Sequence, residues 1–499
     1  MAFSLPANVT LKALLEQKHP AVDAHTQGWE VSLDAYDGEG GFLDGKYLNQ
    51  FQRENADDIL RRRAQARYHN YCQTLVDYYV RKVFSKVTRD TTNELLKAWW
   101  ENIDGAGTDS TTFMRSCLAK ALAAGHIGIL ADKTQSVPTG PSVADERAEV
   151  FVTRYLPQAI LDWRLAKDAK ITAVKLHEDV ESDDLLAGGS EERLLLWDVD
   201  EWVRVTEAEG DDQQVEVERQ THNLGLVPFV VLRPFPSARW TLIGKALVEP
   251  SVLKALYNRG SEQDVVLRDQ AFSVMVVQMN DPEGDVEEAK RLLGNEIGPT
   301  RALFVKGTAT YETPSMEVPA VLEANQQFLI HALYRMAHVP FDVGSKESQT
   351  AEAIRLQHEA LQAVLLSVAS ECQRVELELA KLYFAWTSAT PEQAQAAFES
   401  ADVQITYPET FFEADPQVEL EMLSAAMNAV PAPTFEKEIQ KRIVAMAAPS
   451  LDGSTLDAIH AEIDGGQAEK PDPVEAMALR GGAEARLQDA LAEENEVAA

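Results

Sequence analysis

The chain has 499 residues, of which 45% are hydrophobic and 25% charged, so it is an ordinary folded protein, long enough for more than one core. Its formal net charge of −34 argues against tight, sequence-specific DNA binding, which needs basic patches. Such acidity either keeps a large protein soluble or lets an acidic surface pass a polyanion without sticking, and charge alone does not decide between these.

The cysteines and the N-terminal residues indicate in which cellular compartment the protein is expected. Cys72, Cys117 and Cys372 lie far apart and follow no metal or redox spacing, so we expect buried thiols and no disulfides, in a reducing environment. The first twenty residues lack a basic region followed by an apolar run, and no stretch is long enough to span a bilayer. The sequence therefore predicts a soluble cytoplasmic product without a signal peptide.

The first third of the chain is predicted to be helical. From about Tyr47 to Phe84, apolar residues recur at steps of three and four, as in a helix with one buried face. They are Ile59, Leu60, Tyr68, Tyr71, Leu75, Val76, Tyr79 and Val83. Residues 92–102, with Leu95, Leu96, Trp99 and Trp100, predict a second helix, and "TTFMRSCLAKALAAG" predicts a third. Gly125 ends it, and "HIGILAD" predicts a short strand.

The middle of the chain is predicted to be a β-rich layer on these helices. Three segments read as strands: "FVTRYLPQAILDWRL", "RLLLWDVDEWVRVTE" and "LVPFVVLRPF". Between them, "HEDVESDDLLAGGSE" and "EAEGDDQQVEVERQTHNLG" read as polar, loop-like separators. The fold class expected is thus α+β.

The second half is predicted to hold two long helices. One runs from about Leu247 to Gln270 and is followed by the strand "FSVMVVQM"; residues 298–319 read as irregular or β. The other, about Ser348 to Trp386, is the longest helical stretch and would be about 55 to 60 Å long, at ~1.5 Å per residue. Residues 449–499 are acidic, so we expect weak helices or disorder there.

A phosphate-loop spacing occurs in "GEGGFLDGKYLNQ", where Gly40 is followed after four residues by Gly45 and Lys46. A true loop continues with Ser or Thr, whose hydroxyl binds Mg²⁺, and follows a buried strand. Here the next residue is Tyr47, and the preceding segment is polar and acidic. The sequence therefore argues against an ATP site.

Other chemical motifs are incomplete. His331 and His338 are seven apart with no third ligand nearby, and Ser251 with Lys254 matches an SxxK motif whose companion motifs are missing. The acidic pairs Asp183-Asp184 and Asp211-Asp212 read as solvated loop charges. We expect no catalytic residue, no metal site and no cofactor, and hence not an enzyme.

One resemblance covers residues 41–412. The segment "FLDGKYLNQFQRENADDILRRRAQARYHNYCQTLVDYYVRKVFSK" resembles the opening of portal proteins of tailed, siphovirus-like bacteriophages. Five further segments are similar to that family's motifs and keep their order: "AAGHIGILAD", "YLPQAILDWR", "HNLGLVPFVVL", "VLKALYNRGSEQDVVLRDQAFSVMVVQM" and "SKESQTAEAIRLQHEALQAVLLSVASECQRVELELAKLYFAW". Residues 1–40 and the acidic tail do not take part in the resemblance.

The resemblance implies a portal fold with an α/β wing, a helical stem, a small β-containing clip, a long spine helix and a C-terminal helical crown. It divides the chain as follows: 1–46, lead-in; 47–238, wing with a β-rich layer and a candidate clip towards its C-terminal end; 239–278, candidate stem helix and following strand; 279–339, wing return; 340–352, candidate tunnel loop; 353–390, spine; 391–448, wing end and crown; 449–499, flexible acidic tail.

The resemblance also implies function and partners. Twelve copies would form a ring at one capsid vertex, in the virion and before that in the host cytoplasm, through which double-stranded DNA is packaged and ejected without sequence specificity. Partners would be the large terminase, head–tail adaptors, and the major capsid and scaffolding proteins, with no membrane. Alternatives are another virion structural protein (capsid, scaffolding or adaptor) or, less favoured, a terminase-like ATPase.

Two groups of residues follow as candidate sites. The stem helix carries charges of alternating sign that neighbouring copies could pair: Lys254, Arg259, Glu262, Asp264, Arg268 and Asp269. The tunnel loop would narrow the channel and place one cation near DNA: Gly344, Ser345, Lys346, Glu347 and Ser348.

Overall fold

The computed structural model is a mixed helix and sheet structure, as the expected α+β class requires. The chain divides into two compact units, Met1–Phe411 and Phe412–Ala499. No helix within the described ranges is both long and apolar enough to cross a membrane. The structure describes residues 3, 9–52, 54–134, 149–181, 189–208, 211–237, 242–270, 274–279, 307–312, 317–340, 351–411, 423, 427, 432–447 and 453–465.

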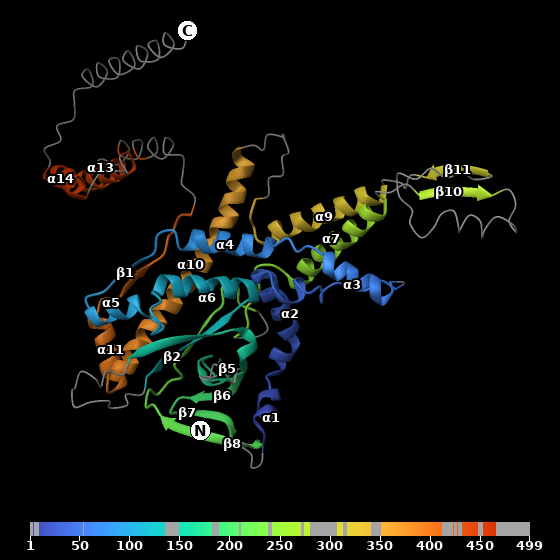
Figure 1. The fold of residues 1–499 in the computed structure, drawn as a ribbon. Helices are drawn as coiled ribbons and strands as arrows, with labels where there is room; N and C mark the ends of the chain where they lie inside the picture. Colours follow the sequence, from blue (N-terminus) through green and yellow to red (C-terminus); the bar gives the residue numbers. More distant parts are fainter. Residues whose placement is uncertain are drawn as a thin grey trace, which may run out of the picture. The chain divides into compact units, whose positions relative to one another are not determined.

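A layer of helices forms one side of the first unit (Figure 1). Most of these helices begin at a side-chain cap, which satisfies backbone N–H groups that have no partner within the helix. Asp109, for example, accepts from the backbone N–H of Thr111 and Thr112 at the start of α6. The bounds in this layer are α2, Pro20–Asp37; the 3₁₀ turn η1, Gly40–Phe42; α4, Tyr71–Val83; α5, Glu94–Glu101; and α6, Ser110–Ala124. A further short helix, α1, Leu11–Glu16, lies apart from it.

Two antiparallel sheets lie beside these helices. One has the order β3-β2-β9, from β2 (Ile127–Lys133), β3 (Val150–Tyr155) and β9 (Phe229–Leu232). The other is a meander: β4, Ile160–Leu165, after the 3₁₀ turn η3, Pro157–Ala159; β5, Ile171–Glu181; β6, Ser190–Asp198; β7, Glu201–Ala208; and β8, Asp211–Thr221. Side chains from both sheets and from α2 share one buried cluster, which includes Trp29, Trp197 and Phe229. The opposite face of the meander packs on α1.

Three helices form what we call the arm: α3 (Ala56–Gln65), α7 (Pro250–Gln270) and α9 (Glu317–Met336). α7 packs along α9, with Gly260 facing Gln326, and on its other side contacts α3. Figure 1 accordingly shows α7 between α3 and α9. The strands β10 (Val274–Met279) and β11 (Gly307–Glu312) pair with each other in the segment between α7 and α9.

The longest helix, α10, runs over Ala351–Thr387 and confirms the helix predicted there. Its predicted apolar face is buried from Leu361 onward: Leu361, Leu365, Val368, Cys372, Val375, Leu379 and Leu382. α11 (Pro391–Ser400) follows, and β12 (Gln404–Thr406) pairs with β1 (Thr88–Asp90). In the second unit, α13 (Pro433–Ala447) and α14 (Gly453–Gly465) are joined by Lys441 and Asp464 at 2.7 Å.

Two glycines let backbone segments meet at the base of the three-stranded sheet. Gly125 ends α6 with φ of 100°, a conformation that disfavours other residues. A Cβ on Gly125 would lie 2.5 Å from the Gly244 carbonyl oxygen, and one on Gly244 would lie 1.9 Å from that of Gly125. Neither site has room for a side chain.

Several sequence predictions need correction. The helical region from Tyr47 to Phe84 is two helices, because Asn70 caps α4 and the chain is extended at Ala66. Leu60, predicted to be core, is 59% exposed. α9 was not predicted, and the polar separators contain the end of β5 and all of β8. β8 pairs only with β7 among the described strands and is largely exposed, so its polar sequence reflects an edge strand.

Candidate functional site

The glycine-rich turn with the phosphate-loop spacing, Gly40 to Tyr47, binds a carboxylate of the chain itself. Asp34 Oδ2 accepts hydrogen bonds from the backbone N–H of Gly41 at 2.9 Å and from the Tyr47 hydroxyl at 2.7 Å. Burial, reinforced by Asp34, raises the pKa of Tyr47. Lys46 points to Glu30, with 2.7 Å between Nζ and Oε1. The glycine-rich turn therefore holds Asp34 where a nucleotide loop would hold a phosphate.

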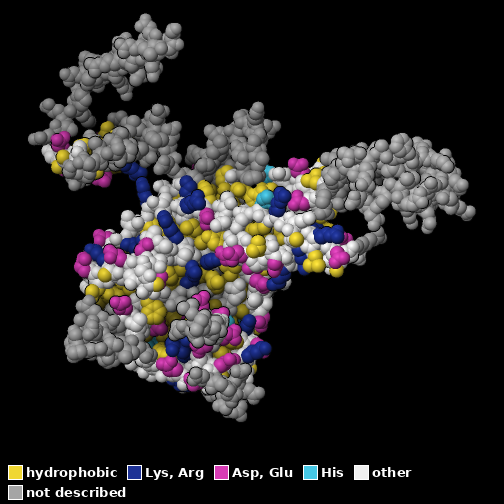
Figure 2. All heavy atoms as spheres, viewed as in Figure 1, with side chains coloured by type: hydrophobic (Ala, Val, Ile, Leu, Met, Phe, Trp, Pro, Cys, Tyr) yellow, Lys and Arg dark blue, Asp and Glu magenta, His cyan; other side chains and the backbone are white. Residues whose placement is uncertain are grey.

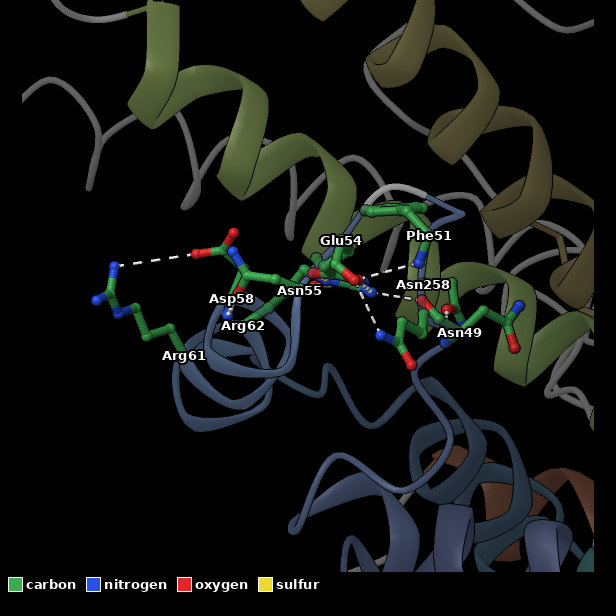
Figure 3. Close-up of polar contacts among 10 residues, drawn as sticks. Asn49, Phe51, Glu54, Asn55, Asp58, Arg61, Arg62 and Asn258 are labelled. Atoms are coloured by element: carbon green, nitrogen blue, oxygen red, sulfur yellow. Dashed lines mark hydrogen bonds and ion pairs between the residues drawn. The ribbon is translucent and has the colours of Figure 1, made fainter.

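Residues 38–52 with 54 and 55 form a lead-in loop, which contains this turn and which a buried ion pair fixes to α3 (Figure 3). Arg62 Nε and Nη2 each donate to a different Glu54 oxygen at 2.8 Å, and the two side chains are only 3% and 8% exposed. The Phe51 ring lies 4.2 Å from the guanidinium, and its backbone N–H also donates to Glu54. Hydrogen bonds from Arg62 hold the pKa of Glu54 below its ordinary value.

A second set of contacts fixes α7 to the same loop. Asn258 Oδ1 accepts from the backbone N–H of Asn49 at 2.8 Å, and Asn258 Nδ2 donates to the carbonyl of Tyr47 at 3.0 Å. Tyr257 donates its hydroxyl to the carbonyl of Phe42 at 2.9 Å. Arg62 also donates to the Asn49 carbonyl and, at 3.5 Å, to Ser261 of α7. Loop, α3 and α7 are thus held as one assembly.

The predicted stem charges lie on α7, but they do not form one exposed row. Lys254 is half-buried, with Nζ 5.4 Å from the Tyr47 ring centre. Arg259 pairs with Glu262 one turn later in the same helix, and Asp264 is exposed. Arg268 and Asp269 lie in the last turn of α7, where the helix is described but their side chains are not. An exposed Arg259–Glu262 pair can still exchange partners with a neighbouring copy at little cost.

The predicted tunnel loop, Gly344 to Ser348, lies outside the described residues. At the end of α9, an open pocket of about 400 Å³ is lined by His331, Arg335 and His338 together with Pro340. Within the described ranges, no group of three or more His, Cys, Asp or Glu side chains is placed to hold a metal ion. Ser251 and Lys254 lie on the first turns of α7, where Ser251 is exposed and Lys254 packs on Tyr47.

The long helix α10 is fixed to the first unit by a buried charge. Arg89 of β1 donates to both oxygens of Glu376 at 2.7 Å and to the Thr111 hydroxyl at 2.7 Å. Tyr407 donates its hydroxyl to the same carboxylate. Burial alone would lower the pKa of Arg89, but Glu376 raises it above its ordinary value. This cluster joins β1, α6, α10 and the residue after β12.

Sequence reasoning missed the fixing residues Arg62, Asn258 and Glu376. A signal existed for Arg62, because it follows the buried Ile59 by three residues and so falls on the buried face of α3. Asn258 has no such signal, because it lies five residues after Leu253 and two after Leu256, spacings that do not share one face of a helix. A polar residue at an apolar position of a helical pattern indicates a buried partner, which the sequence does not name.

No known protein family and no curated protein matches the sequence. Among solved structures, the chain is similar to one from the virion of a native gene transfer agent particle, with 12% identity over 87% of this chain and 98% of that chain and a TM-score of 0.37. It is also similar to a chain from the neck of an empty gene transfer agent particle, with 12% identity over 80% and 94% and a TM-score of 0.39. A third, from the neck of the native particle, gives 13% identity over 72% and 85% and a TM-score of 0.36.

Proposed function

We propose that the chain is a portal protein: copies assemble into a ring at a virion vertex, and double-stranded DNA passes through the central channel. The observation that carries the proposal is the order of six sequence motifs along residues 41–412, each similar to a portal motif. Several of these segments coincide with elements of the fold, including β2, β9, α7 and α10. The large terminase, head–tail adaptors, and capsid and scaffolding proteins are the partners that follow.

The charge of the chain supports this role. Each phosphate neutralised by a lysine or arginine adds salt-dependent affinity, which would slow a moving polymer. A chain with 80 acidic and 46 basic residues, −34 in net charge, avoids that affinity. The assembled ring should therefore bind double-stranded DNA weakly at physiological salt.

Negative-stain images of the purified full chain test the proposal directly. Rings with a central hole are expected, with a subunit number that native mass spectrometry gives. Closed shells, irregular aggregates or monomers at every concentration would instead favour another virion structural protein. The same preparation should bind no ATP, because Asp34 occupies the glycine-rich turn; tight nucleotide binding would favour the terminase-like alternative.

For the tunnel loop the proposal rests on sequence alone. Lys346 would be one of few cations facing DNA, so Lys346→Glu should leave ring formation intact and reduce DNA packaging or retention. Lys97→Glu is a matched control, because Lys97 is a solvent-accessible lysine on α5 paired only with Glu94 in the described contacts. Equal packaging by both variants would place residues 344–348 away from the channel.

A further inference from the structure

The arm and the lead-in loop together expose much of the large apolar surface of the described chain. Large apolar side chains that are exposed in the described part of the chain number eleven, and six of these lie on the arm or on the lead-in loop. The six are Leu43, Phe51, Leu60, Leu267, Val321 and Phe328; the other five are Leu95, Val217, Leu226, Leu366 and Phe435. Figure 2 shows hydrophobic side chains at the surface of this part of the molecule. Exposed apolar surface gathered on a few helices marks an interaction site.

On α9 the exposed apolar residues form a stripe. Val321, Ala324 and Phe328 are spaced by three and four residues, so they share one helix face. Val321 is 67% and Phe328 60% exposed. The buried residues Ile330 and Leu333 lie on the opposite face. The stripe therefore points away from the helices on which α9 packs.

α3 presents a smaller apolar face. Leu60 and Ala64 are exposed and four residues apart, hence adjacent on one side of the helix. Ile59 and Arg62 face the other way and are buried. Because α7 lies between α3 and α9, the Leu60 face and the Val321 stripe are two different surfaces of one copy (Figure 1).

Two different surfaces that fit each other give a head-to-tail contact, which closes into a ring, whereas a surface that pairs with itself stops at a dimer. The polar groups beside the two apolar faces are complementary, a guanidinium and an imidazole on α9 and a carboxylate on α3. After Phe328, the same side of α9 carries His331 and Arg335; before Leu60, α3 carries Asp57. All three are exposed.

The order of these charges sets the direction of the contact. Along α9 the apolar residues come before the basic ones, and along α3 the acidic residue comes before the apolar ones. If the two helices run antiparallel with Leu60 opposite Phe328, then Asp57 is three residues from Leu60 and His331 three residues from Phe328, on the same side. A parallel arrangement would place Asp57 against the apolar Ala324 or Val321 instead.

We propose that α3 of one copy docks antiparallel on the Val321–Ala324–Phe328 stripe of α9 in the next copy. The occupant of the stripe is thus a second copy of this chain. This inference rests on the proposed ring and names the contact that closes it.

Cysteine cross-linking tests the contact, since a disulfide needs Cβ atoms within about 3.5 to 4.5 Å. The native Cys72, Cys117 and Cys372 are buried, which keeps the background low. Under mild oxidation, Leu60→Cys combined with Phe328→Cys in one chain should give a ladder of covalent oligomers. A mixture of the two single variants should give dimers only, and each single variant alone should give none. Leu95→Cys combined with Phe328→Cys is the control, because Leu95 is 63% exposed on α5, and it should give no ladder.

The outcomes separate this contact from the proposed function. Rings seen in negative stain without a 60–328 ladder would overturn the contact and leave the ring standing. Dimers from a single variant would also overturn it, because they indicate a surface that pairs with itself. If the parent chain forms no rings under any condition, the proposed function fails, and the contact fails with it. As a second readout, Phe328→Asp in the otherwise native chain should lower the ring fraction severalfold while leaving the thermal midpoint of the monomer unchanged.

Discussion

The arm, taken together with the lead-in loop, differs from the rest of the first unit, here called the body, in how much of its apolar surface is exposed to solvent. In the body, α10 buries a continuous apolar face, and the charge of Glu376 is enclosed by Arg89 and Tyr407. The arm and the lead-in loop share one buried ion pair, Arg62 of α3 with Glu54 of the loop, and leave large apolar side chains in solvent. Within the described residues the body also exposes four large apolar side chains, but these are scattered over it, whereas the arm and the loop gather six on a few short segments, as surface that a further molecule would bury. The difference indicates which part of the fold serves stability and which serves association.

Removing the buried arginine of the body should have the largest effect. Arg89→Ala leaves the Glu376 carboxylate buried without its cation, and breaking such a pair costs about 3 to 5 kcal/mol. We expect a large fall in the free energy of unfolding, measured by denaturant titration, for the whole first unit. Glu376→Gln should cost less, because the amide keeps part of the hydrogen bonding. A loss below 1 kcal/mol would contradict the view that this cluster fixes α10 to the body.

Removing the buried arginine of the arm should have a local effect. Arg62→Ala leaves Glu54 unpaired and should cost about 3 kcal/mol, the low end of the range for a broken buried pair, within the loop–α3–α7 assembly. Limited proteolysis should then cut residues 38–55 faster, while the body unfolds as before. Arg61→Ala is the matched control, since the Arg61 side chain is 74% exposed and 4.0 Å from Asp58. Equal proteolysis rates for both variants would contradict the anchoring role.

Acid should act on the arm through Glu54. Its pKa is lowered in the fold, so its pairing stabilises the arm above the ordinary glutamate pKa, and that contribution is lost as the pH falls through the lower, folded value. Proteolysis of residues 38–55 measured between pH 7 and pH 3 should accelerate only at the acid end, and Arg62→Ala should flatten this dependence.

Asp132 of β2 should give the opposite dependence of stability on pH in the body. Burial raises the pKa of its carboxyl to about 6, so the ionised form costs stability above that pH, and the cost disappears as the pH falls from about 6 towards 4. Asp132→Asn should therefore stabilise the body at pH 7.5 by up to about 3 kcal/mol, since its pKa rises from 3.8 to about 6 and each pKa unit is worth about 1.4 kcal/mol. The gain should vanish near pH 4. An equal gain at both pH values would point to packing rather than charge.

The smallest effect is expected at Lys46. Its contact with Glu30 is solvent-exposed, so Lys46→Ala should leave the free energy of unfolding almost unchanged and leave ring assembly and DNA packaging intact. Normal rings that fail to package DNA would reveal a role for the glycine-rich turn that its closed geometry does not explain.

The sequence predicted the elements whose residues repeat with a clear period. The α10 face, the strand from Ile127 and the helix ended by Gly125 follow from apolar spacing and a helix-ending glycine. α9 was missed because its exposed side is itself partly apolar, at Val321 and Phe328, which blurs a helical pattern. β8 was missed because an exposed edge strand needs no alternation.

The candidate site was predictable only in part. Charge alternation on α7 was visible, but Arg259 and Glu262 turn out to pair along their own helix. That Arg62 pairs with Glu54 and Asn258 with Asn49 depends on where the loop crosses the helices. Spacing along the chain does not determine such a crossing, because it is set by tertiary packing.

The two facing glycines have a consequence for the ancestry of the chain. Gly125 and Gly244 touch backbone to backbone, so neither can gain a side chain unless the path of the two backbone segments changes. A substitution at one of the two positions cannot make room for a side chain at the other, because the atoms in the way are backbone atoms. A recombination event that brings in only one of the two segments must therefore supply glycine at the same place. Segments 120–130 and 235–248 are expected to be inherited together, or to be exchanged only between parents that share these backbone paths.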